Sequence, residues 1–120
     1  RHTMPELQLV NGQDEPWQLG YLIDVILTRD PWMHRIDIAR ATGAELALTP
    51  DHDGVLVDDV VREWAARHGQ PYSLVLTGPA GGTWNRGGGG PNLEYDAVEF
   101  CRILAGRAEG AGLLATEVPF

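Results

Sequence analysis

The chain contains no lysine, so its nine basic residues are all arginines. This absence excludes mechanisms that need a lysine, such as a Schiff base, a lysine general base or a phosphate-binding loop with its lysine. Lysine codons are rich in A and most arginine codons are rich in G and C, so the composition indicates a GC-rich bacterial genome. A single cysteine, Cys101, excludes a disulfide within the chain and fits a reducing cytoplasm.

An excess of positive charge and long apolar runs are missing too. The formal net charge is −8 and no cluster of basic residues occurs, so we expect neither nucleic acid nor a membrane as a partner. No apolar stretch reaches the length of a membrane span, and no signal-peptide pattern opens the sequence. The 120 residues are enough for one hydrophobic core, and we expect a cytoplasmic globular protein.

The first part of the chain predicts one long helix. Residues 1–18 show no clear periodicity and are expected to form an irregular lead-in, whereas apolar residues from 19 to 41 recur with a helical period. Gly43 suits the position just after a helix. Pro31 interrupts the pattern, because it lacks a backbone N–H and clashes with the preceding turn. Either it kinks or divides the helix, or Asp30 is the N-cap of a new helix with Pro31 in its first position.

A second helix is the clearest prediction in the sequence. Thr49 is a natural N-cap, Pro50 suits the first helical position, and Gly69 ends the apolar stripe that follows. A boundary between two parts of the chain falls near residues 44–49.

The pattern after this helix predicts a small sheet and a third helix. The expected elements are a β-hairpin with strands at 72–77 and 83–86, a possible third strand at 92–96, and a helix at 97–104. Residues 107–120 fit either a short helix or a strand. The sequence therefore predicts an α+β fold, with a lead-in and long helix in residues 1–45 and a small α+β domain in residues 46–120.

Asp30, His34 and Asp37 are the best candidates for a chemical site. Residues three or four apart lie on one face of a helix, so these side chains are expected to line up. A carboxylate and an imidazole one turn apart can bind the same divalent ion, such as Zn²⁺ or Ni²⁺, although a catalytic zinc needs about three protein ligands. The alternative is a structural histidine that a carboxylate holds within a helix-packing surface.

Other reactive or glycine-rich features have simpler interpretations. None of His2, His52 and His68 has metal-ligand spacing to His34. Glycines within residues 78–90 lack the spacing of a nucleotide-binding motif and fit a hairpin turn and a flexible loop. Cys101 lies among apolar residues of a predicted helix, where a cysteine is usually a small buried hydrophobe.

Two stretches resemble a known family, the mycothiol-dependent maleylpyruvate isomerase-like proteins of the DinB-like metal-binding superfamily. Residues 21–24 (YLID) and 28–43 (TRDPWMHRIDIARATG) are similar to the last helix of the metal-binding bundle. Residues 76–82 (LTGPAGG) and 96–107 (DAVEFCRILAGR) are similar to the smaller, sterol-carrier-like C-terminal domain. The resemblance covers residues 19–120, the C-terminal half of such a protein, and the lysine-free composition agrees with an actinobacterial source.

The resemblance implies a metal site and a thiol cofactor. Asp30 and His34 would be ligands of a divalent metal, with zinc the favoured ion, and Asp37 would orient His34 from outside the coordination sphere. The metal would activate mycothiol as a thiolate, which adds to a small electrophilic substrate. The third ligand of the family is a histidine on an earlier bundle helix, which this sequence lacks; His2 could replace it only if the lead-in folds back.

Two functions remain open at this stage. In the first, the chain is the C-terminal part of a mycothiol-dependent isomerase or thiol transferase, and a missing N-terminal bundle segment, a second chain or a homo-oligomer covers the long helix. In the second, the chain is a non-enzymatic α+β binding or interaction module that is an obligate oligomer or partner subunit. In that case Asp30 caps a helix and His34 is structural.

Overall fold

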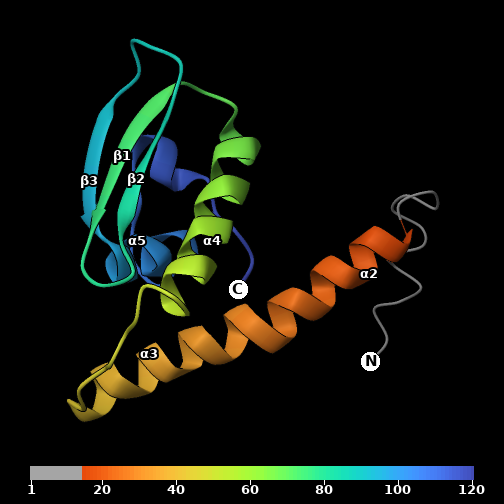
Figure 1. The fold of residues 1–120 in the computed structure, drawn as a ribbon, viewed down its shortest axis with the longest axis vertical. Coiled ribbons are helices and arrows are strands. Elements are labelled where there is room, and N and C mark those ends of the chain that lie inside the picture. The colour runs from red at the N-terminus through yellow and green to blue at the C-terminus, as the bar shows by residue number, and fades with distance from the viewer. Residues whose placement is uncertain (1–14) are drawn as a thin grey trace.

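The computed structural model describes residues 15–120, which form a mixed α+β fold as the sequence predicted (Figure 1). Most of the expected lead-in lies outside the described residues. Its last four residues, 15–18, are helical, so the long helix begins earlier than predicted. None of the helices in the described part of the chain is long and apolar enough to cross a membrane.

The long helix consists of three consecutive pieces. They are α2 (Glu15–Asp24), the π-helical turn η2 (Val25–Arg29) and α3 (Asp30–Thr42). Gly43 ends the helix in the left-handed conformation, with φ +74°, as expected for a C-terminal glycine. Figure 1 shows the sheet, α4 and α5 on one side of this helix.

Pro31 explains the wide turn. In a regular α-helix its ring would collide with the carbonyl group four residues earlier, and no N–H would be available to bond it. The π-helical turn directly before Pro31 opens the backbone, and the N–H of Asp30 donates to the carbonyl of Val25, five residues back. Asp30 has helical backbone angles, so the alternative in which it caps a new helix is wrong.

The wide turn also keeps one face of the helix buried throughout. Val25 and Arg29 before Pro31 are buried, and so are Trp32, Met33 and Ile36 after it. Apolar side chains on the rest of the helix remain exposed, namely Ile23, Ile26, Leu27 and Ile38. The helix therefore has an inner face packed on the domain and an outer face that the described residues leave uncovered.

Helix α4 (Asp53–His68) begins later than the sequence predicted, because residues 50–52 form a turn. The N-cap is His52, which has no side-chain cap, so the predicted N-cap at Thr49 is wrong. Thr49 instead closes the turn before the helix. The N–H of His52 donates to Thr49 Oγ1 at 3.3 Å, and the N–H of Thr49 donates to Asp53 Oδ2 at 2.7 Å. Gly69 ends the helix with φ +64°, as predicted.

The sheet has three strands in the order β2-β1-β3, namely β1 (Tyr72–Thr77), β2 (Gly82–Arg86) and β3 (Asn92–Asp96). Strands β1 and β2 form the predicted antiparallel hairpin, in which Leu74 pairs with Trp84. The third strand is present and runs parallel to β1, with Leu74 opposite Leu93. Gly81 is required in the hairpin turn, since a Cβ there would collide with the carbonyl of Leu76.

The hydrophobic core lies between one face of the sheet and helices α4 and α5 (Ala97–Leu104). Trp64 is at its centre, with edge-to-face contacts to Tyr72 at 5.0 Å and Phe100 at 5.2 Å between ring centroids. The C-terminal segment contains one 3₁₀ turn, η3 (Gly112–Ala115), where the sequence did not decide between helix and strand. The indole N–H of Trp64 donates to the carbonyl of Leu113 and fastens this turn to the core.

Asp53 joins the long helix to the start of α4. Its carboxylate is almost fully buried and accepts hydrogen bonds from Trp32 Nε1 at 2.8 Å, Arg35 at 3.1 Å and the Thr49 N–H. Burial opposes ionisation of Asp53, but the bonds from Thr49 and Trp32 and the charge of Arg35 outweigh it, so the pKa is lowered.

We expect Asp53→Ala to lower the free energy of unfolding by ~2–4 kcal/mol, because three donors lose their acceptor in a buried site. The exposed neighbour Asp51 provides the control, and Asp51→Ala should change stability by less than about 0.5 kcal/mol. Urea unfolding measures the stability of both variants.

The pKa of Asp53 is lowered in the fold. The ionised carboxylate therefore stabilises the folded state fully above the unfolded pKa of about 3.9. The difference in free energy of unfolding between the wild type and Asp53→Ala should therefore shrink as the pH falls below that value. A difference that does not change with pH would contradict this role of the Asp53 carboxylate.

Candidate functional site

Asp30 and His34 lie next to each other on α3, as the sequence predicted. The distance from His34 Nε2 to Asp30 Oδ1 is 3.6 Å, and the side chains are 65% and 49% exposed. Both groups point to solvent and not into the hydrophobic core, so they are free to bind a ligand. One carboxylate and one imidazole a turn apart provide two donors of the kind that zinc prefers. The residues present therefore fit two positions of a divalent metal site.

Asp37 has a different partner from the one expected. Its carboxylate accepts three hydrogen bonds from Arg107, at 2.8, 3.2 and 3.2 Å. The bonds from Arg107 are the main cause of the lowered pKa of Asp37, and His34 contributes only through its charge. This bidentate contact ties α3 to the segment after α5. The predicted role of Asp37 in orienting His34 remains a prediction.

A third metal ligand is not found beside this pair. Among the described residues, no group of three or more histidine, cysteine, aspartate or glutamate side chains is arranged to hold a metal. His68 packs edge-to-face against Trp64 and Tyr72, and its Nδ1 accepts the N–H of Gln70. Burial and the charge of Arg86 lower its pKa. His2, the fourth histidine of the sequence, lies outside the described residues.

Cys101 is fully buried in α5, as predicted for a small hydrophobic residue. Burial raises the pKa of its thiol well above the ordinary value. A thiol that is neither exposed nor ionised cannot act as a nucleophile at neutral pH. Cys101 therefore contributes to packing and not to the chemistry of the site.

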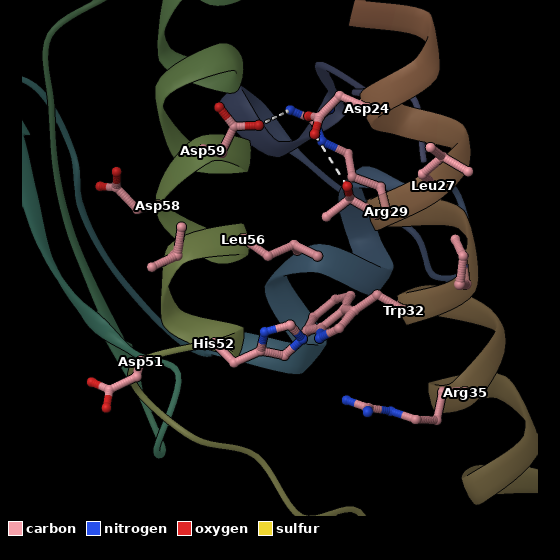
Figure 2. A pocket seen from close by; sticks show the side chains of 13 residues that line it. Asp24, Leu27, Arg29, Trp32, Arg35, Asp51, His52, Leu56, Asp58 and Asp59 are labelled. Carbon is pink, nitrogen blue, oxygen red and sulfur yellow. Dashed lines mark hydrogen bonds and ion pairs between the residues drawn. The ribbon is translucent and has the colours of Figure 1, made fainter.

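A groove between the long helix and α4 is the feature that the sequence analysis missed. Figure 2 shows side chains from both helices around it, among them Trp32, His52 and Asp59. The cavity has a volume of about 720 Å³, and a neighbouring cavity of about 850 Å³ continues along the same pair of helices. The walls combine aliphatic side chains with carboxylates and arginines, so the groove is amphipathic.

Arg29 forms the floor between the two cavities. It is 2% exposed and contacts Asp59 and Glu63 at 2.8 Å each and the carbonyl of Pro119 at 3.0 Å. The hydroxyl of Tyr21 also donates to Glu63, at 2.8 Å. Burial opposes the charge of Arg29, but the two carboxylates outweigh it and raise its pKa. The charge of Arg29 is thus neutralised within the protein, and its role is to connect three segments.

A signal for Arg29 was present in the sequence. It stands four residues before Met33 and seven before Ile36, on the stripe that packs inward, where a charged residue needs a partner. The partners could not be identified in advance, because they lie 30 residues or more further along the chain. Only the packing of α4 and the C-terminus against the helix brings them together.

Comparisons of this chain with models of known protein families, with curated proteins and with solved structures found no match. Function is therefore inferred from the geometry of the chain itself. Two features support that inference: the exposed pair of Asp30 and His34, and the outer face of the helix that bears them, which residues 15–120 leave uncovered.

We expect Arg29→Met to reduce the free energy of unfolding by about 3 kcal/mol, since it removes the cation from a buried ion-pair network. Combining it with Glu63→Gln should recover part of this loss, because Glu63, which keeps Tyr21 and Arg67 as partners, then no longer carries the charge that Arg29 balanced. The exposed pair of Arg62 and Asp58 is the control, and Arg62→Met should have little effect. Chemical denaturation of the wild type, the two single variants, the double variant and Arg62→Met tests the network. A double variant as unstable as the sum of the two single changes would argue against it.

Proposed function

We propose that this chain is the C-terminal part of a metal-dependent, mycothiol-dependent isomerase or thiol transferase-like protein that acts on a small electrophilic substrate in the cytoplasm. The observation that carries the proposal is the pair of Asp30 and His34, 3.6 Å apart on the outer face of the long helix. The residues around the pair resemble the metal-binding segment of the mycothiol-dependent family.

Asp30 and His34 would hold a divalent metal, with zinc the favoured ion because it takes both donor types. When bound, such a metal supplies a Lewis acid that lowers the pKa of a coordinated thiol. The chain's own residues would position the metal: the helix fixes the two donors one turn apart, and Asp37, on the same side of the helix, would orient His34 from outside the coordination sphere.

The outer face of the helix supports a second part of the proposal. Exposed apolar side chains accompany the pair along the helix, and they are Ile23, Ile26 and Ile38; Leu27 is exposed as well but lines the groove against α4. Monomeric proteins rarely leave such a face uncovered. We infer that a bundle segment, a second chain or a second copy packs here, supplies further ligands and excludes water. Residues 46–120 would be the sterol-carrier-like domain that supports the helix.

The metal proposal predicts a stoichiometric divalent ion that depends on two side chains. Zinc should bind to the protein in its assembled form, and His34→Ala or Asp30→Asn should weaken binding by a factor of about 10–100, since each removes one ligand. His52→Ala, which alters an exposed histidine elsewhere, is the matched control. Metal analysis after dialysis, followed by a thiol-transfer assay with mycothiol, provides the measurement. Equal metal content in all four proteins would exclude this pair as ligands.

The uncovered helix face also favours a second candidate, a non-enzymatic binding or interaction module. In this case His34 contributes to a contact surface and not to a metal site. His34→Ala should then change the oligomeric state or the melting temperature while metal content stays at zero throughout. Light scattering and calorimetry on the wild type and the variant test this function. A loss of bound metal without unfolding would count against it.

A further inference from the structure

On the outer face of the long helix, apolar and polar residues follow one another in the same order whether the helix is read forwards or backwards. Asp30 and His34 occupy its centre, Ile26 precedes Asp30 by four residues, and Ile38 follows His34 by four. All four side chains are exposed to a large degree, from 38% for Ile26 to 65% for His34. A spacing of four residues keeps them on one side of the helix.

An antiparallel copy of the same helix would match this pattern. With a two-fold axis at the level between Asp30 and His34, Ile26 faces Ile38 of the second copy, and each Asp30 faces a His34. Apolar groups then meet apolar groups, and each carboxylate meets an imidazole. Such self-complementarity is the requirement for a two-fold symmetric interface.

We propose that a second copy of this chain packs antiparallel on this face, and that the two Asp30–His34 pairs together form a four-ligand site for one divalent cation of the zinc type. The inference rests on the proposed function in one respect, namely that Asp30 and His34 are metal ligands. It differs in assigning the remaining two ligands to the second copy. Because four protein ligands leave no open position for a thiol, the site it describes is structural and not catalytic.

Two observations favour a second copy as the occupant, and the overall charge opposes it unless a cation binds at the axis. Two histidines and two carboxylates complete the tetrahedral set that zinc takes, whereas a single copy offers only two of them beside each other. Each chain carries a net charge of −8, so two copies repel, and a divalent cation at the axis would neutralise the two carboxylates that approach most closely. The helix from Glu15 to Thr42 is about 40 Å long, which provides several turns of contact.

The experiment measures oligomeric state and zinc content together, by native mass spectrometry and light scattering of the full chain with zinc or with a chelator. We expect a dimer with one zinc per two chains, and a chelator should weaken dimerisation at least about tenfold. Ile38→Glu should give a monomer without tightly bound zinc. Val55→Glu is the matched control, because Val55 on α4 is 65% exposed and Ile38 is 61% exposed, and it should leave the dimer intact.

A cysteine pair tests the register. An equal mixture of Ile26→Cys and Ile38→Cys chains should form a mixed disulfide under mild oxidation, while Val55→Cys mixed with Ile38→Cys should not. The buried Cys101 does not interfere. A disulfide between two Ile26→Cys chains in place of the mixed one would overturn the antiparallel arrangement.

The remaining outcomes separate this inference from the proposed function. A monomer with one zinc bound through His34 would overturn the second copy but leave the metal proposal standing. A zinc-free dimer that Asp30→Asn does not affect would overturn the site and the ligand assignment together. A zinc-free monomer would likewise overturn both for this chain.

Discussion

The ring of Pro31 would clash with the preceding turn of a regular α-helix. The rest of the structure depends on how the helix avoids this clash. The helix widens to a π turn at Val25–Arg29 and continues without a break. As a result Arg29 faces inward with Met33 and Ile36, and Asp30 is free of any capping role. An N-cap at position 30 would have directed its carboxylate to the backbone, away from His34.

Two buried charges then hold the helix against the domain at separate points. Asp53 receives donors from Trp32 and Arg35 near the beginning of α4, while Arg29 reaches Asp59 and Glu63 along the same helix. Because each charge is buried and partnered, neither contact can be broken without a large cost. The long helix is therefore a rigid element whose inner face is fully used and whose outer face presents Asp30 and His34 in a defined position.

This division of the helix into two faces links the fold to the chemistry. The inner face provides stability, the groove against α4 is lined in part by side chains that pair with each other, such as Arg29 and Asp59, and Asp30 and His34 lie on the side that the described residues leave uncovered. Asp37 lies between these regions, since it is fastened to Arg107 and still contributes negative charge near His34. In the proposed function Asp30 and His34 would be half of a coordination sphere, and its completion would depend on what packs against the outer face.

The sequence alone determined the local features of this protein. Helical periodicity, Gly43 and Gly69 predicted the helix ends, the alternating pattern at Tyr72–Thr77 predicted β1, and the spacing of Asp30 and His34 predicted their proximity, because all of these depend on neighbours within a few residues. The tertiary structure decided the contacts between distant segments: Asp37 with Arg107, Arg29 with Asp59, β3 parallel to β1, and the groove along α4. It also resolved the ambiguity at Pro31 in favour of a continuous helix, since the energy of packing Val25, Arg29 and Met33 on one face outweighs the cost of one wide turn.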